Sequence, residues 1–137
     1  MANEFVGPTR FQWTDRQLNV VNALLRLFPK NYALLYQSQV PKLRSVRPSR
    51  LSMWLSDPSE AVESSDIIPM LREYFRIVKI NGYGGSVLHL LFSGIGHHFV
   101  HPDTVAEHLL RVSFEVEDLL LKSGELSHDF ALLVCQK

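Results

Sequence analysis

The sequence has almost no cysteine, no excess of charge and no long apolar run. Cys135 is the single cysteine, which excludes an internal disulfide framework and a cysteine-rich zinc site. Lys and Arg number 14, as do Asp and Glu, so the long-range attraction that favours binding to nucleic acid or an anionic membrane is absent. The apolar runs fall short of the ~20 residues that a membrane span needs, and no signal-peptide pattern is present. We therefore expect a soluble, cytoplasmic single domain over residues 1–137 that binds neither nucleic acid nor membrane.

Helical periodicity dominates what is present. Hydrophobic residues make up 46% of the chain, enough for a packed core, and the pattern indicates about five helices. The clearest helix begins after Thr14, which forms a capping box with Gln17, and it ends before Pro29. One helical stripe carries its apolar residues, which are Leu18, Val21, Leu24, Leu25 and Phe28.

Three further helices are predicted over residues 67–74, 87–95 and 103–123. In the longest one, Thr104 and Glu107 are expected to form the capping box. Its apolar residues keep a helical period for four turns and predict the face that packs against the core. These residues are Val105, Leu109, Val112, Val116 and Leu119.

Two segments of strand length stand apart from the helices. Phe75–Tyr83 is short, rich in β-branched residues and bounded by Gly82, which favours a strand. Phe130–Cys135 is an unbroken apolar run, which is typical of a central strand covered on both faces.

Three motifs suggest ligand sites but match them poorly. The loop Gly82–Ser86 lacks the spacing of phosphate-binding loops, so its glycines are expected to allow a tight turn and the approach of another backbone. His97 and His101 precede Pro102, which favours a polar turn over a metal site, and we expect no bound metal. The basic cluster is interpreted as a solvated excursion, with an anion site or a subunit contact as alternatives. Its members are Lys42, Arg44, Arg47 and Arg50.

The opening NEFVGPTRFQWTD and the ending SHDFALLVCQK, with the strands between them, resemble the C-terminal half of a class I S-adenosylmethionine-dependent methyltransferase. In that family a seven-stranded, mostly parallel sheet ends with strand six and an antiparallel strand seven. Asn3–Val6 then resembles the end of strand five, Phe75–Tyr83 strand six and Phe130–Cys135 strand seven. The resemblance implies a helix-rich α/β fold with a partial Rossmann-like sheet, and a chain that begins in the middle of that fold.

The cofactor-binding part of the family pattern has no counterpart here. In the family, a glycine-rich loop after strand one and an acidic residue after strand two hold the cofactor. Neither occurs in this sequence, so no cofactor-binding residue is expected. The resemblance implies S-adenosylmethionine as the cofactor of a full-length member and none for this chain alone.

The part of the family's active site that the resemblance does assign to this chain is the surface that binds the methyl acceptor, a small molecule of unknown identity. Glu4 is the candidate base or acceptor contact, and Arg10 is placed to bind an acidic acceptor. Phe11 and Trp13 are expected to line the acceptor pocket. Two alternatives stay open: Glu4 is a solvated terminal residue, and Trp13 is a packing anchor stapled to Leu18 at the helix start.

Two classes of function follow. The first is the C-terminal portion of a methyltransferase, which contributes acceptor-side and subunit-contact surface and is not active alone. The alternative is a non-catalytic helical interaction or dimerisation module. In either case the open strand edges and broad apolar helix faces predict a homodimer, or association with the missing N-terminal half of the fold.

Overall fold

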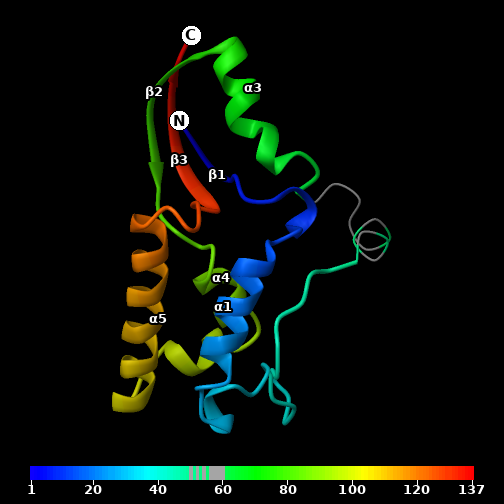
Figure 1. Ribbon diagram of the computed structural model, residues 1–137, viewed down its shortest axis with the longest axis vertical. Coiled ribbons are helices and arrows are strands. Elements are labelled where there is room, and N and C mark those ends of the chain that lie inside the picture. Colours follow the sequence, from blue (N-terminus) through cyan, green and yellow to red (C-terminus); the bar gives the residue numbers. More distant parts are fainter. Residues whose placement is uncertain (50, 52, 54, 56–60) are drawn as a thin grey trace. The chain divides into compact units, whose positions relative to one another are not determined.

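The computed structural model describes residues 1–49, 51, 53, 55 and 61–137, and it divides into two compact units (Figure 1). Unit 1 comprises Met1–Thr14, Arg47–Ser86 and Ser127–Lys137, and unit 2 comprises Asp15–Val46 and Val87–Leu126. Unit 1 contains the sheet, whereas unit 2 contains three of the α-helices. Arg50 of the basic cluster lies outside the described residues.

The sheet of unit 1 has three strands in the order β1-β3-β2. They are β1 (Ala2–Phe5), β2 (Arg76–Gly82) and β3 (Phe130–Gln136). Both outer strands pair antiparallel with β3, so β1 and β2 run parallel to each other. The carboxyl ends of β1 and β2 therefore lie at the same end of the sheet, on either side of the start of β3.

These bounds confirm the three predicted strands to within one residue at each end. β3 is central as predicted, because it is hydrogen-bonded on both edges. Its buried residues Ala131 and Leu133 lie on one face, whereas Leu132 and Val134 on the other face are only half-buried, so, contrary to expectation, the two faces are not equally covered. The outer strand β2 is mostly exposed, and a bulge between Ile77 and Lys79 leaves Val78 in solvent.

Glycines let the strand ends approach the segment before β3. A Cβ atom on Gly82 would lie 2.3 Å from the His128 ring, and one on Gly85 would lie 2.3 Å from the Phe130 ring. The backbone N–H of Gly84 also donates to Nδ1 of His128 at 2.9 Å. The carbonyl of Gly84 accepts from the backbone N–H groups of Asp129 at 3.0 Å and Phe130 at 3.1 Å, so another backbone approaches the loop as expected, and the glycines make room for side chains as well.

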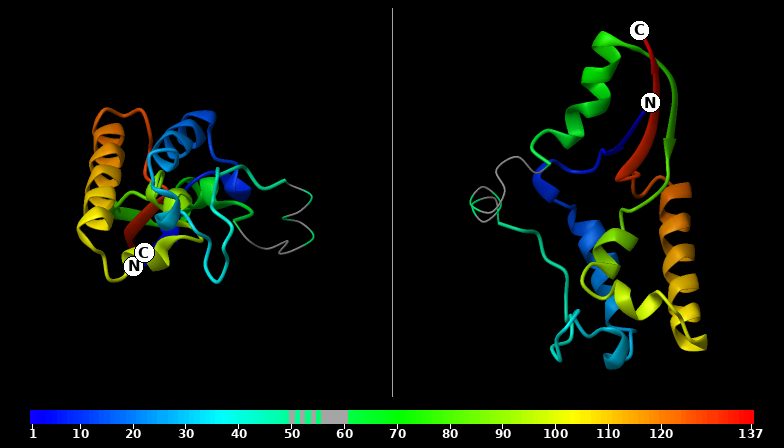
Figure 2. Two further views of the ribbon diagram at one scale, coloured as in Figure 1. Left: turned by 90° about the horizontal axis from the view of Figure 1, so that it is seen from below. Right: turned by 180° about the vertical axis from the view of Figure 1, so that it is seen from behind.

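A single α-helix, α3 (Ile67–Tyr74), follows the short 3₁₀ turn η3 (Ser64–Asp66) and leads into β2. It confirms the helix predicted over 67–74. α3 lies beside the strands in both side views (Figure 1; Figure 2, right).

Unit 2 is helical, with α1 (Asp15–Leu25), α4 (Leu88–Phe92) and α5 (Thr104–Lys122). α4 contacts both longer helices and lies between them (Figure 1; Figure 2, right). Most of the predicted apolar stripe of α1 is buried, but the helix ends at Leu25 rather than at Phe28. Phe28 instead packs beside Phe92 and Phe99 after a turn.

Charged side chains hold the five-residue helix α4 at both ends. One carboxylate oxygen of Glu117 accepts from the backbone N–H groups of Val87 at 2.6 Å and Leu88 at 2.9 Å. At the other end, the Lys42 ammonium donates to three carbonyl oxygens, those of Leu90, Leu91 and Ser93. Both contacts satisfy terminal backbone groups and oppose the helix dipole. The interpretation of Lys42 as part of a solvated excursion is therefore wrong.

α5 differs from its prediction at its cap and at its packed face. The N-cap is Asp103, whose side chain accepts from the backbone N–H of Ala106 at 2.8 Å, and not Thr104. The buried residues of α5 are Ala106, Ser113 and Glu117, whereas Val105 and Val112 are exposed. The face of α5 that packs against the core is the one that carries Glu117, which contacts α4, and small residues that permit close packing. It is not the face of the predicted apolar stripe.

Bounds are described for four α-helices, compared with the five or so expected, together with the three-stranded antiparallel sheet. The chain is thus α/β at this coarser level.

His97 and His98 lie in a 3₁₀ turn, Gly96–Phe99, which ends before His101. Within the described ranges, every helix is too short or too polar to cross a bilayer.

Candidate functional site

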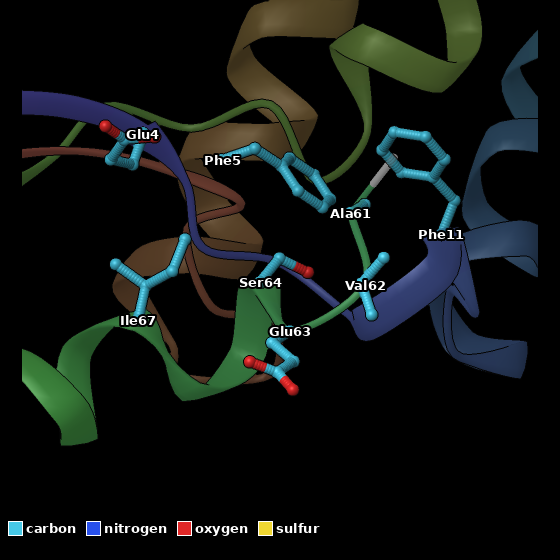
Figure 3. Close-up of a pocket in the computed structure, with 8 residues that line it drawn as sticks. All are labelled: Glu4, Phe5, Phe11, Ala61, Val62, Glu63, Ser64 and Ile67. Carbon is cyan, nitrogen blue, oxygen red and sulfur yellow. The ribbon is translucent and has the colours of Figure 1, made fainter. Parts of the chain in front are cut away.

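A pocket of about 460 Å³ opens at the carboxyl end of β1, entirely within unit 1. Three stretches of chain supply its lining: the end of β1, the 3₁₀ turn η1 (Thr9–Phe11), and the segment that leads into α3. Figure 3 shows the lining residues Glu4, Phe5, Phe11, Ala61, Val62, Glu63, Ser64 and Ile67. In open α/β sheets the carboxyl ends of parallel strands are where ligands bind.

Hydrogen bonds join the two sides of this pocket across more than fifty residues of sequence. The backbone N–H of Arg10 donates to the carbonyl of Ala61 at 2.6 Å. The buried Ser64 hydroxyl donates to the carbonyl of Gly7 at 2.9 Å, and the hydroxyls of Thr9 and Ser65 lie 2.6 Å apart. The segment before α3 is therefore fixed against the turn that follows β1.

The backbone around the pocket adopts conformations that side-chain-bearing residues rarely adopt. Positive φ values occur at four described non-glycine residues, and three of these adjoin the pocket: Arg10 (53°), Phe11 (50°) and Ala61 (48°). Such conformations cost free energy and persist only where surrounding contacts hold them. Here the side chain of Gln12 contributes, since it donates to the carbonyls of Arg10 and Pro48, each at 3.1 Å.

An aromatic wall forms one side of the pocket. The rings of Phe5 and Phe11 meet edge to face, with centroids 5.0 Å apart. Trp13 stacks on Phe11 at 5.3 Å, and Phe130 contacts Phe5 edge to face at 5.3 Å. Both lining rings thus have an aromatic neighbour outside the pocket, which restricts their rotation and keeps the wall in place.

Two carboxylates are the ionisable groups among the lining residues. Glu4 comes from β1 and Glu63 from the segment before η3, and both are exposed. The lining has no histidine, cysteine or lysine, so a proton taken from a bound molecule would pass to one of these carboxylates. The arrangement can hold a largely apolar molecule and offer it a carboxylate, but it carries no activated nucleophile.

Of the four residues predicted for the site, Glu4 and Phe11 line the same pocket. Trp13 does not line it but supports Phe11 from behind, in agreement with the interpretation of Trp13 as a packing residue. Arg10 is also absent from the lining, and its buried Nη1 atom has no hydrogen-bond partner among the described residues.

The remaining lining residues were missed from the sequence. Phe5 adjoins Glu4 and could have been found from the predicted strand end. By contrast, Ala61–Ser64 and Ile67 carry no local signal of a site, because only tertiary hydrogen bonds bring them to β1.

The glycine-rich loop after β2 does not have the features of a cofactor-binding loop. It packs against the side chains of His128 and Phe130, and its Gly84 N–H is already bonded to His128. This loop therefore does not offer free N–H groups to a cofactor.

Across the described ranges, no three His, Cys, Asp or Glu side chains are grouped so as to hold a metal ion.

Comparisons of the chain with protein-family models, with curated proteins and with solved structures found no match.

Proposed function

We propose that the chain forms the acceptor side of an S-adenosylmethionine-dependent methyltransferase and that it is not active alone. The observation that carries the proposal is the pocket at the carboxyl end of β1, which contains Glu4 and Phe11. Glu4 comes from the segment that resembles the end of strand five, and Phe11 comes from the turn η1 that follows it.

The strand directions also support the proposal. β1 and β2 are parallel and β3 is antiparallel to both, as the resemblance expects of strands five, six and seven. On this assignment the Rossmann-like sheet would continue beyond the free edge of β1, where the remaining strands of the family would pair.

The chemistry of the pocket is compatible with an acceptor site. Methyl transfer to a nucleophilic atom depends largely on alignment, which a rigid aromatic wall and a fixed backbone provide. Glu4 would accept a proton from a hydroxyl or amine acceptor. Residues of another segment would hold the cofactor, since the glycine-rich loop after β2 packs against His128 and Phe130.

Isothermal titration with S-adenosylmethionine tests this proposal. The protein to use is the gene product translated with any coding sequence upstream of Met1, with the 137-residue chain alone as the control. We expect saturable binding by the longer protein and none by the control. Absence of binding by the longer protein would refute the proposal.

A second candidate, a homodimeric interaction module, has its own supporting observation on α5. Its apolar residues alternate at spacings of four and three, the spacing of a coiled-coil seam. They are Val105, Leu109, Val112, Val116 and Leu119, of which Val105, Val112 and Leu119 are 46%, 50% and 65% exposed. A second copy of the chain, packed seam to seam, would cover them.

Light scattering after size exclusion tests this dimer. We expect the wild-type chain to elute as a dimer and Val112→Glu to elute as a monomer. Phe114→Glu is the matched control, because Phe114 is a similarly exposed apolar residue of α5 off the seam, and this variant should remain dimeric. A monomeric wild-type chain would exclude the dimer.

A further inference from the structure

We infer that the pocket at the end of β1 takes a small ligand with an apolar or aromatic body and a protonated amine. The inference rests on the proposed function only where it identifies this ligand with the methyl acceptor. Size, wall chemistry and charge each contribute to it.

The size and the walls define the apolar body of the ligand. At about 460 Å³ the pocket falls within the range of roughly 300–1,000 Å³ typical of small-molecule sites. Its walls are mainly apolar, with two phenyl rings on one side and Val62 and Ile67 on the other (Figure 3). A ring or a branched alkyl group of the ligand would pack against the Phe5–Phe11 pair.

The charge of the lining defines the polar end of the ligand. Glu4 and Glu63 are the charged lining residues, and no cationic side chain lines the pocket. Aromatic faces attract cations as well, so the wall and the two carboxylates favour the same sign of charge. An anionic ligand would meet two like charges, and the Arg10 guanidinium lies outside the lining.

A neutral alcohol is the closest competing ligand class, because it would fill the same apolar space. It differs from an amine in gaining nothing from the carboxylates beyond a hydrogen bond. Three probes of matched size therefore separate the classes: phenethylamine, 2-phenylethanol and phenylacetate.

The test is a titration of the ¹⁵N-labelled, 137-residue chain with each probe, followed by amide chemical shifts. We expect saturable shifts around Ala61–Ser64 and Phe11, with the amine binding more tightly than the alcohol and the alcohol more tightly than phenylacetate. Added salt should weaken binding of the amine but not of the alcohol, since only the amine is attracted by charge.

Charge-neutral variants show which carboxylates attract the amine. Glu4→Gln and Glu63→Gln should each weaken amine binding by about two- to five-fold, the range of exposed ion pairs, and leave alcohol binding unchanged. Glu73→Gln is the matched control, because Glu73 is an exposed carboxylate of α3 outside the pocket, and it should change neither. The spectra also report whether each variant is folded.

Three results would overturn the inference: phenylacetate binding as tightly as phenethylamine, amine affinity unchanged in both glutamine variants, or no saturable shift with any probe. The outcome is separable from that of the proposed function. Amine selectivity with no binding of S-adenosylmethionine by the longer protein would leave the ligand class in place and refute the methyltransferase. Cofactor binding without amine selectivity would leave the methyltransferase proposal in place and refute the ligand class.

Discussion

Replacement of Glu117 tests how the helical unit is held together. The residue is only 4% exposed, and its carboxylate accepts two backbone hydrogen bonds from the start of α4. A hydrogen bond to a charged group contributes about 1.5–3 kcal/mol. Because one oxygen atom serves both donors, we use the lower value for each, and Glu117→Ala should lower the free energy of unfolding by about 3 kcal/mol.

Glu117→Gln keeps the volume and an acceptor oxygen but loses the charge. Charge-assisted hydrogen bonds are roughly twice as strong as neutral ones, so this variant should lose about 1.5 kcal/mol. The control is Glu115→Gln, an exposed residue of the same helix, which should stay within about 0.5 kcal/mol of wild type.

Urea denaturation followed by far-ultraviolet circular dichroism measures all three variants. Hydrogen exchange adds a local readout, because the amides of Val87 and Leu88 should lose protection in Glu117→Ala before the rest of the unit does. If Glu117→Ala were as stable as Glu115→Gln, the clamp on α4 would contribute nothing and the reasoning would be refuted.

Three further variants test other contacts. Gly85→Ala should destabilise the chain by about 2–4 kcal/mol, because its Cβ atom would meet the Phe130 ring and its φ is +89°; urea denaturation measures this. Burial lowers the pKa of Lys42 to about 8 from 10.5. The folded state therefore binds fewer protons than the unfolded state between these values, and the free energy of unfolding should rise from pH 8 to pH 10. Its slope should stay below ~1.4 kcal/mol per pH unit, since solvent screens this partly exposed group. Asp103→Ala should lower the thermal midpoint of unfolding, whereas Thr104→Ala should not, because Asp103 is the N-cap of α5.

Matched controls separate these effects from general destabilisation. Gly124 also has a positive φ of +75° but has nothing within 4 Å of an added Cβ atom, so Gly124→Ala should cost clearly less than Gly85→Ala. Equal costs would show that Phe130 plays no part. Lys42→Gln should flatten the pH dependence while Lys30→Gln leaves it unchanged, and a slope that survives in Lys42→Gln would contradict the assignment. Equal midpoints for the Asp103 and Thr104 variants would contradict the capping contact.

Local patterns predicted the elements of the fold but not every contact between them. The strands over 75–83 and 130–135 and the helix over 67–74 followed from composition and periodicity, which tertiary packing left unchanged. The packed face of α5 was mispredicted, because burial of Glu117 against α4 outweighed the apolar stripe. No periodicity analysis detects a buried carboxylate whose partners are backbone N–H groups thirty residues away.

Two of the four candidate site residues line the pocket. Glu4 lies in β1 and Phe11 in the turn that follows it, and both the strand end and the turn are visible in the sequence. The opposite wall, Ala61–Ile67, depends on hydrogen bonds such as that from Ser64 to Gly7, and residue patterns carry no signal for such long-range bonds. Lys42 was misassigned for the same reason, because its carbonyl partners lie near residue 90.

The most direct test of the central proposal is the binding of S-adenosylmethionine by the gene product that carries this chain. Calorimetric titration should give saturable binding when sequence upstream of Met1 is included, and none for the 137 residues alone. No binding by the longer protein would contradict the methyltransferase assignment. Binding by the 137-residue chain would contradict the proposal that another segment holds the cofactor.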